Sequence, residues 1–298
     1  MPVYNGERFI REALDSLLNQ TFTEFELVIS DNGSTDATEE ICRDYAQRDP
    51  RVTYLRNDVN RGAAWNFNNV VHVATGRLFK WAAADDVHDP EHVAHCVAAL
   101  DADPTAVAAY TQSLYIDEAG NRQEEYDPGW DLRSDNAYER MKIVILRGGH
   151  WVNADPLLGV MRTDALRRTR LFPKYQGGDK RPIGELSLIG KILQVPGHLL
   201  MRRRHAGASN TNNPHSTQYN EASIEWMSEF FKGSSWQIKL PSWTLLADHA
   251  QSVWASDLPL TDKLKLAATV ARACRWQSGF LWSELKAASR PLPKKRAP

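Results

Sequence analysis

The stretch FELVISDNGSTD, residues 25–36, decides the fold class of this chain. Residues 25–30 form a short apolar run that is typical of a buried strand, and the polar residues 31–34 after it predict a turn. Ser34 or Thr35 can cap the helix that follows. A strand, a polar turn and a helix in direct succession are one repeating unit of an α/β protein.

The same alternation continues on both sides of this stretch. Residues 1–5 are typical of a strand that ends in a turn, and apolar residues recur at helical spacing over 10–18. Further strands and helices are predicted at 52–55, 60–76, 78–82 and 90–100. Strands that alternate with helices imply a doubly wound, mostly parallel sheet flanked by helices, as in Rossmann-like proteins.

The second half of the chain has a mixed pattern and then a helical one. Strands are expected at 107–116 and 157–161, and a helix at 186–193 that closes before Pro196. From about residue 217 onward the pattern is helical. We therefore expect three regions, an α/β half, a second half of the same domain and a helical C-terminal extension, at 1–110, 111–210 and 211–298.

The composition excludes several classes of protein. The chain has 298 residues, of which 42% are apolar and 24% charged, as is typical of a globular protein. Its three cysteines, Cys42, Cys96 and Cys274, are far apart and lack CxxC spacing, so neither a disulfide framework nor a zinc ribbon is indicated. No apolar run approaches the ~20 residues that span a bilayer, and no signal peptide opens the chain, so we expect a cytoplasmic location.

Charge is distributed unevenly along the chain. The net charge of −1 is the small difference between two halves of opposite sign. Residues 1–140 contain 12 basic and 26 acidic side chains, whereas residues 141–298 contain 24 basic and 11 acidic ones. This asymmetry predicts two surfaces with different partners, and without an overall basic excess we do not expect nucleic acid among them.

Carboxylates follow two of the predicted strands. Asp31 ends the strand at 25–30, and Asp85 and Asp86 follow the strand at 78–82. In parallel sheets ligands bind at the carboxyl ends of the strands, so these residues should meet in one crevice. Paired carboxylates there can hold a hard divalent cation that in turn holds phosphates. Alone, each motif could equally be a helix-capping turn or a solvated loop.

Five segments together resemble glycosyltransferase family 2, namely PVYN at 2–5, LLNQTF at 17–22, FELVISDNGSTD at 25–36, NRG at 60–62 and ADD at 84–86. The resemblance covers roughly residues 1–210, and the family consists of inverting enzymes of the GT-A fold that use nucleotide sugars. It implies that residues 1–110 bind a nucleotide-diphosphate sugar, a UDP-sugar being favoured. Residues 111–210 would bind a glycan or lipid-linked acceptor.

The resemblance also implies which residues contact the donor. The positions that match the family's nucleotide-sugar site are Pro2, Tyr4, Asn5, Glu7, Asp31, Arg61, Asn66, Asp85 and Asp86. Asp31 would contact the nucleoside. Asp85 and Asp86 stand at the DxD-like position that touches the ribose and a diphosphate-bound Mg²⁺ or Mn²⁺. His205 is expected either at that metal or in a pair with a carboxylate.

Two residues compete for the role of catalytic base. Asp179 matches the family's base position by its spacing to Gly190, and an alternative register places Glu185 there. An acceptor hydroxyl needs one carboxylate that takes its proton as the oxygen attacks the anomeric carbon. On residue type alone, Asp179 could also be an ordinary turn residue after two glycines.

Two features depart from the family pattern. Ala83 stands where the family commonly has an acid, so metal binding would rest mainly on Asp85 and Asp86. Only Met1 precedes the PVYN segment, which leaves a very short central strand, and we expect the natural start to lie upstream. These departures keep open a catalytically degenerate binding protein, and the acidic crevice keeps open a nucleotidyltransferase, as alternatives to an inverting transferase of glycan, glycolipid or polysaccharide biosynthesis.

The C-terminal third is rich in tryptophan. Six of the ten tryptophans lie there, at positions Trp226, Trp236, Trp243, Trp254, Trp276 and Trp282. Residues 262–286 place apolar side chains at helical spacing with Lys and Arg between them. Such a stretch either packs on the catalytic domain or lies on an anionic membrane surface, which would place the protein at the inner face of the membrane.

Overall fold

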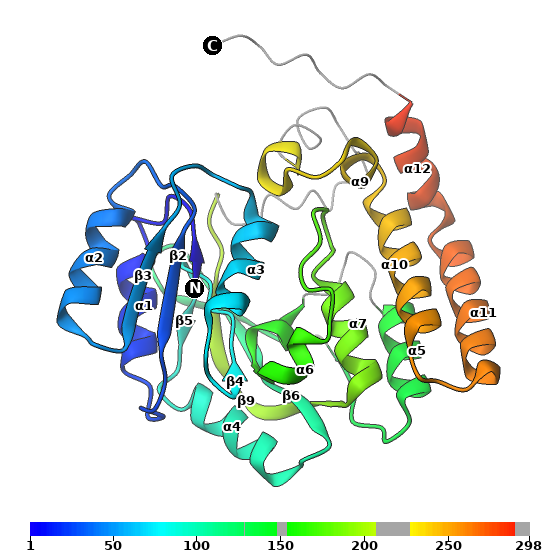
Figure 1. The fold of residues 1–298 in the computed structure, drawn as a ribbon, viewed down its shortest axis with the longest axis horizontal. Coiled ribbons are helices and arrows are strands. Elements are labelled where there is room, and N and C mark those ends of the chain that lie inside the picture. Colours follow the sequence, from blue (N-terminus) through cyan, green and yellow to red (C-terminus); the bar gives the residue numbers. More distant parts are fainter. Residues whose placement is uncertain (128, 148–153, 207–226, 290–298) are drawn as a thin grey trace.

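The computed structural model describes residues 1–127, 129–147, 154–206 and 227–289. Its N-terminal part is a three-stranded parallel sheet in the order β1-β2-β3, with strands β1 (Pro2–Val3), β2 (Leu27–Asp31) and β3 (Val52–Arg56). Helices connect and cover these strands, namely α1 (Ile10–Leu18), α2 (Thr38–Arg48) and α3 (Ala63–Val73) (Figure 1). The predicted strand, turn and helix unit at residues 25–36 is confirmed.

The central strand β2 is held by apolar contacts on its faces. All five of its residues are buried, which explains its continuous apolar run. Helix α1 turns Ile10, Leu14 and Leu17 inward, and these side chains share a core with Leu27 and Ile29 of β2. At about 25 cal/mol per Å² of apolar surface, each such leucine or isoleucine contributes about 1.5–3 kcal/mol.

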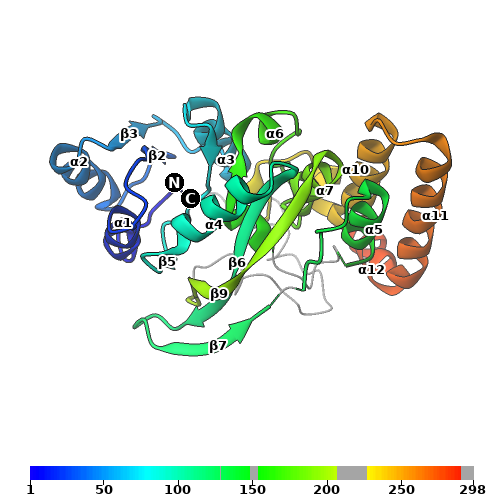
Figure 2. The ribbon, with the colours of Figure 1, turned by 90° about the horizontal axis from the view of Figure 1, so that it is seen from below.

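A second sheet of six strands forms the middle of the molecule (Figure 2). Its strands are β4 (Leu78–Phe79), β5 (Val87–His88), β6 (Ala106–Ile116), β7 (Arg122–Tyr126), β8 (Val160–Arg162) and β9 (Lys191–Arg203). The order is β4-β8-β6-β9-β5, with β7 paired to β6. Only β6 and β9 run parallel, and the other pairs are antiparallel. The α/β class with a parallel sheet is therefore confirmed, and the second sheet adds antiparallel pairs.

Three predicted elements differ in the structure. The strand expected at 78–82 is limited to β4, and the strand expected at 157–161 is a 3₁₀ helix (Asp155–Leu158) followed by β8. The helix expected at 186–193 is α7 (Lys180–Ile189), and β9 runs on through Pro196. The pairing of β6 with β9 shifts register around this proline, which cannot donate to the ladder.

Helices cover the second sheet and extend beyond it. Its covering helices are α4 (His92–Ala102), α5 (Ala137–Arg147), α6 (Thr163–Arg167) and α7. The helical C-terminal extension is confirmed and comprises α9 (Ser235–Lys239), α10 (Pro241–Ala255), α11 (Leu260–Trp276) and α12 (Ser278–Ala288). Figure 1 shows α10 and α11 beside α5 and α7 at the end of the molecule away from α1 and α2.

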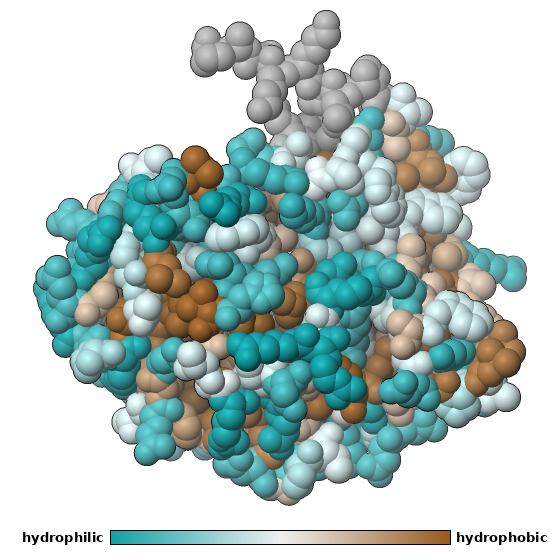
Figure 3. All heavy atoms as spheres, in the orientation of Figure 1, coloured by the Kyte–Doolittle hydropathy of each residue, from teal (hydrophilic) through white to brown (hydrophobic). Residues whose placement is uncertain are grey.

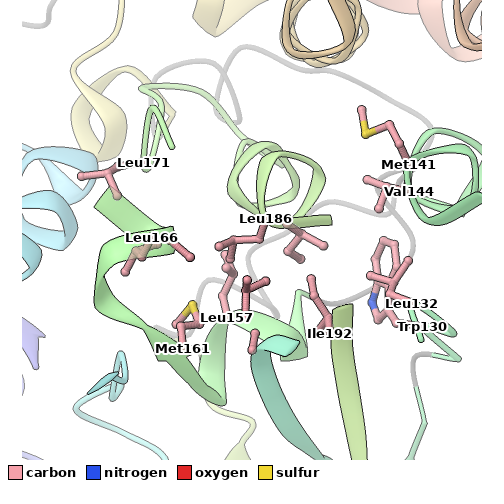
Figure 4. Packing of buried hydrophobic residues seen from close by; sticks show 14 of the residues in the cluster. Trp130, Leu132, Met141, Val144, Leu157, Met161, Leu166, Leu171, Leu186 and Ile192 are labelled. Atoms are coloured by element: carbon pink, nitrogen blue, oxygen red, sulfur yellow. The ribbon is translucent and has the colours of Figure 1, made fainter. Parts of the chain in front are cut away.

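The largest core lies under α7. Leu186 of α7 is at the centre of this core (Figure 4). Leu157 and Ile192 surround it on the side of the sheet, and Met141 and Leu166 on the side of the neighbouring helices. Gly190 ends the helix, and a Cβ there would come within 2.7 Å of the Thr105 carbonyl oxygen. Glycine is therefore needed for the direct change from α7 to β9.

A cavity of about 350 Å³ lies between the two sheets. Met1, Leu27 and Val28 line it on one side, and Phe79 and Lys80 on the other. The Met1 amino nitrogen is buried there and donates to the Val28 carbonyl oxygen at 2.6 Å. The expectation of further residues before Met1 stays a prediction.

Candidate active site

Asp31 lies at the end of β2 and is fully buried. Its Oδ1 accepts from the Ser34 amide at 2.8 Å, and its Oδ2 accepts from the Tyr54 hydroxyl at 2.6 Å. Burial and this bond raise the pKa of Tyr54, so the phenol keeps its proton and donates. The carboxylate thus shapes the turn at residues 31–34, and its predicted contact with a nucleoside stays a prediction.

The PVYN segment is joined to this turn by hydrogen bonds. Asn5 adopts a left-handed backbone with φ of 51°, its amide donates to Ser34 Oγ at 2.9 Å, and its Oδ1 accepts from the Thr35 amide at 2.9 Å. Glu7 accepts from the Ala37 amide at the start of α2 at 2.8 Å. Tyr4 is 47% exposed beside them. These hydrogen bonds hold the two segments against each other.

The other residues predicted to contact the nucleotide sugar differ in their burial and in their contacts. Pro2 is buried in β1. Asn66 is buried, and its side-chain amide donates to the carbonyl oxygens of Val3 at 3.2 Å and Ser30 at 2.8 Å, which joins α3 to β1 and β2. Arg61 is exposed, and its guanidinium stacks on the Trp65 ring at 4.7 Å. Of the three, Arg61 is the one able to meet a ligand from solvent.

Asp85 and Asp86 lie before β5, next to the end of β9. Asp86 is buried, and its Oδ1 accepts from the Arg203 amide at 3.0 Å. Asp85 is half-buried, and its Oδ2 lies 2.9 Å from His205 Nε2. Burial and then the neighbouring Asp85 raise the pKa of Asp86 to about 7, against the opposing effect of Arg202. The structure therefore brings the predicted acid pair and His205 together.

Sequence reasoning missed a buried ion pair beside this site. Arg202 Nη1 donates to Asp155 Oδ1 at 2.8 Å, and Ser113 Oγ donates to Asp155 Oδ2 at 2.6 Å. Burial lowers the pKa of Arg202, but the nearby charges of Asp155 and then Asp86 outweigh this effect and raise that pKa. Asp155 is 40 to 70 positions from its partners in the sequence, and no motif marked it.

The two neighbouring arginines are structural. Arg203 is buried and donates to Glu12 of α1, to the Asp85 carbonyl oxygen, and to the carbonyl oxygens of residues 117 and 118. Arg204 pairs with Glu124 at 2.8 Å. The side chains of Arg203 and Arg204 are therefore held by partners other than the Asp85 and Asp86 carboxylates.

The acid pair fits a divalent cation of the magnesium type. Within the described ranges, no group of three His, Cys, Asp or Glu side chains forms a complete metal cage. Mg²⁺ and Mn²⁺ sites of nucleotide enzymes commonly use one or two carboxylates and take their other ligands from phosphates and water. Burial is the main cause of the raised pKa of Asp86 and the neighbouring Asp85 is the second, and a bound cation would favour the ionised form of both carboxyl groups.

The two candidate bases have different surroundings. Asp179 precedes α7, its side chain is 34% exposed, and it lies 3.2 Å from the buried Lys180 ammonium. Glu185 is buried in α7, where its oxygens accept from the Arg170 amide and guanidinium at 2.6 Å and from Ser252 Oγ at 3.0 Å. Its contacts bind α10 to α7. No described contact joins Asp179 to the acid pair.

A sequence model described as Glycosyl transferase family 2 matches residues 1–167, which is more than half of the chain. The chain belongs to this family. A family 2 member from Methanocaldococcus jannaschii, the uncharacterized glycosyltransferase MJ1057, is 28% identical over 130 residues, 43% of this chain and 45% of that protein. The chondroitin synthase of Escherichia coli is 32% identical over 121 residues, 41% of this chain and 18% of that enzyme. The chain thus spans less than half the length of these family 2 relatives.

Solved structures confirm the GT-A fold of this family 2 enzyme. TarS of S. aureus, residues 1–349 with UDP-GlcNAc, superposes with a TM-score of 0.65 at 19% identity over 92% of this chain and 70% of TarS. The mannosyltransferase PcManGT from Pyrobaculum calidifontis, solved with GDP-Man and Mn²⁺, gives a TM-score of 0.52 at 19% identity over 97% of this chain and 84% of PcManGT. Among the helices that the structure describes, none is both long and apolar enough to cross a bilayer.

Proposed function

We propose that this glycosyltransferase is an inverting enzyme that moves a sugar from a nucleotide-diphosphate donor to an acceptor hydroxyl of a glycan, glycolipid or polysaccharide intermediate. The observation that carries the proposal is the close pair Asp85 and Asp86, held by β9 at the sheet edge of a GT-A fold. A UDP-sugar is the favoured donor because TarS, with the same fold, was solved with UDP-GlcNAc.

The crevice supplies the groups that a donor needs. Tyr4 and Asn5, beside the turn of residues 31–34, offer an exposed ring and a polar edge to the nucleoside. Asp85 and Asp86 would hold Mg²⁺ or Mn²⁺, whose charge would neutralise the departing diphosphate. The Arg203 amide holds Asp86 in place, and the Arg202 guanidinium opposes the effect of burial on the pKa of Asp86.

The acceptor requires a base, and we assign that role to Asp179. Its carboxylate is accessible at the start of α7, whereas Glu185 is already fully engaged by Arg170 and Ser252. Asp179 would take the proton of the acceptor hydroxyl as the oxygen attacks the anomeric carbon from the face opposite the diphosphate. A single displacement of this kind inverts the anomeric configuration. Glycosidases instead place two carboxylates around the bond.

Donor binding and turnover test this function directly. We expect UDP and UDP-GlcNAc to raise the melting temperature in the presence of Mn²⁺ and to do so weakly without it. GDP-mannose is the comparison donor. Release of UDP from UDP-GlcNAc, even by slow hydrolysis, would exclude a degenerate binding protein. Release of pyrophosphate from a nucleoside triphosphate and a sugar phosphate would instead identify a nucleotidyltransferase.

We also propose that the outer face of α11 and α12 contacts an anionic membrane surface. Leu266, Thr269 and Ala273 of α11 pack inward, which accounts for one face of the helix. The opposite face of α11 exposes Leu260 and Leu264, and three further apolar side chains are exposed at the end of α11 and on α12, namely Trp276, Trp282 and Leu285. Figure 3 shows apolar side chains gathered along this edge of the molecule. Trp226 and the tail at 290–298 lie outside the described residues.

The charges on these two helices support this contact. Arg272, Arg275 and Lys286 are exposed, whereas both acids of α11 and α12 have partners, Asp262 at the surface with the exposed Lys265 and the buried Glu284 with Ser242. Exposed tryptophan beside basic residues is typical of a helix that lies on anionic lipid.

Liposome flotation tests the membrane contact. We expect the enzyme to float with vesicles of phosphatidylglycerol and to remain soluble with phosphatidylcholine alone. R272E with R275E should abolish flotation, while R43E with R48E on α2 should leave it intact. Equal behaviour of the two double variants would refute this surface.

A further inference from the structure

The loop that carries Asp179 is tied to the C-terminal extension at a single carboxylate. Asp248 lies on α10 with 14% of its side chain exposed. Its Oδ2 accepts from the Tyr175 hydroxyl at 2.5 Å and from Arg181 Nη1 at 3.2 Å. Tyr175 lies four residues before Asp179, and Arg181 lies two residues after it. One carboxylate oxygen therefore holds both ends of the segment that contains the proposed base.

Other contacts make this tie rigid. The second oxygen of Asp248 accepts from Arg170 Nη1 at 3.1 Å, and Arg170 also bonds Glu185 at 2.6 Å. Arg181 donates in addition to the carbonyl oxygens of Arg170 and Leu171 at 2.7 and 2.8 Å. A charged group that makes several hydrogen bonds in a buried setting is costly to move, since each lost partner leaves an unpaired charge.

The segment between the two ties has little freedom of its own. Gly177 adopts a φ of 74°, and the Gly178 amide donates to the Tyr175 carbonyl oxygen at 3.3 Å. A Cβ on Gly178 would lie 2.2 Å from the Pro173 ring, so the backbone passes very close to its neighbour. The Tyr175 ring is itself buried. A shift of Asp248 would therefore be transmitted to the backbone before Asp179.

We propose that Asp248 is a positioning residue that sets the place of the Asp179 carboxylate, so that the C-terminal extension takes part in catalysis through the loop of residues 175–181. This inference rests on the proposed role of Asp179 as the base. Misplacement of a catalytic group by about 1 Å can reduce a rate about 100-fold, so a tie of this kind has a measurable effect. Asp248 itself touches neither donor nor acceptor in this scheme.

The test compares D248N with D179N and with the double variant. D248N keeps the shape of the side chain but replaces one acceptor oxygen with a donor amide. We expect its kcat for UDP release from UDP-GlcNAc to fall 10- to 100-fold while the Kd of UDP with Mn²⁺ stays unchanged. The double variant should be no slower than D179N, because both changes act at one group. D257N, an exposed acid after α10, is the matched control and should keep full kcat.

Local proteolysis gives a readout that does not depend on turnover. Lys174 is exposed immediately before the tied segment. Trypsin should cleave after Lys174 at least five times faster in D248N than in the parent enzyme or in D257N. D248E, which keeps both acceptors, should recover part of kcat and of the protection.

Three outcomes separate the proposals. An unchanged kcat in D248N, or an unchanged cleavage rate after Lys174, overturns the role of Asp248. A kcat loss in D248N that multiplies with that of D179N also overturns it, since the two residues would then act independently. Full activity of D179N instead refutes Asp179 as the base and leaves donor binding by the acid pair untouched.

Discussion

At the scale of single residues, the site combines the adjacent acids Asp85 and Asp86 with the accessible carboxylate of Asp179. Asp86 is buried beside Asp85 and has a pKa raised to about 7, so its ionised form costs stability in the absence of a cation. Asp179 has no such neighbour and is open to solvent on one side. The two carboxyl sites are thus suited to different tasks, the first to a cation and the second to a proton.

Replacing Asp86 should weaken donor binding and turnover while it raises the melting temperature of the ligand-free protein. We expect D86N to abolish the Mn²⁺-dependent rise in melting temperature with UDP and to lower kcat/KM at least 100-fold. The ligand-free variant should melt several degrees higher at pH 8. The reason is that an acid with a raised pKa destabilises the fold above that pKa, and the amide removes this cost. D101N on α4 serves as the control for loss of one exposed acid.

Replacement of Asp179 should stop transfer without a change in stability, whereas replacement of Glu185 should lower stability. D179N should keep the parent melting temperature and the parent Kd for UDP while transfer stops. E185Q should lower the free energy of unfolding by about 2–3 kcal/mol, because the Arg170 guanidinium loses one of its two charged partners and keeps only Asp248. Urea unfolding and single-turnover kinetics on both variants decide the assignment. Loss of transfer in a fully stable E185Q would reverse it.

At the scale of elements, the contact between α7 and α10 joins the catalytic domain to its extension. His249 of α10 is buried, and its ring lies 3.2 Å from the position that a Cβ on Gly184 of α7 would occupy. Neither ring nitrogen has a hydrogen-bond partner among the described residues. Burial lowers the pKa of His249 to about 4, so the imidazole is neutral in the folded enzyme at neutral pH.

This histidine makes the contact sensitive to acid. Between pH 6.5 and 4 the unfolded chain binds a proton at His249 and the folded chain does not, so stability falls as the pH falls. The full difference corresponds to about 3 kcal/mol. H249L should therefore flatten the loss of stability between pH 6.5 and 4, whereas H72L at an exposed site should not. Urea midpoints measured at half-unit intervals of pH provide the comparison.

Local patterns predicted some elements and not others for definite physical reasons. The apolar run of β2 and the spacing of α1 are local signals, so both elements were found. The end of α7 was misplaced because Pro196 looked like a terminator, although it lies at an irregular point of β9 that the long pairing with β6 tolerates. Pairing partners far along the chain override local preference in this way.

The sequence predicted those residues of the candidate site that come directly after a strand. Asp85, Asp86 and His205 come together as expected. Asp155 and Asp248 carried no signal, because Asp155 acquires its setting only from partners at least 42 positions away and Asp248 from partners at least 67 positions away. Burial of Asp31 and Asn66 inside the protein could not be foreseen either.

At the scale of the whole molecule, two sheets meet around the cavity next to Met1. β1 pairs with β2 at Pro2 and Val3, and Met1 continues this pairing, since its amino nitrogen donates to the Val28 carbonyl oxygen. The buried amino group of Met1 has a pKa lowered to about 5, chiefly by desolvation. The cavity therefore combines apolar walls with a group that is costly to ionise.

An N-terminal extension should fill this space. We expect the residues Val-Ser-Val-Ile, added before Met1, to raise the melting temperature by roughly 5 °C, because apolar side chains become buried and the amine becomes a peptide N–H. A Gly-Ser-Gly-Ser extension removes the same charge without adding apolar surface and should give a smaller rise. Equal melting temperatures for the parent and both extended proteins would show that the cavity does not accept a strand.

The long strand β9 has a consequence for how this enzyme can change. It starts one residue after α7 and ends two residues before His205, and its pairing with β6 shifts register around Pro196. Near its end the side chains alternate, with Arg202 turned toward Asp155 and Arg203 toward Glu12. Loss of one residue between Pro196 and Arg202 would exchange these two faces. Insertions and deletions should therefore be tolerated in the loops around this strand and not in its last residues.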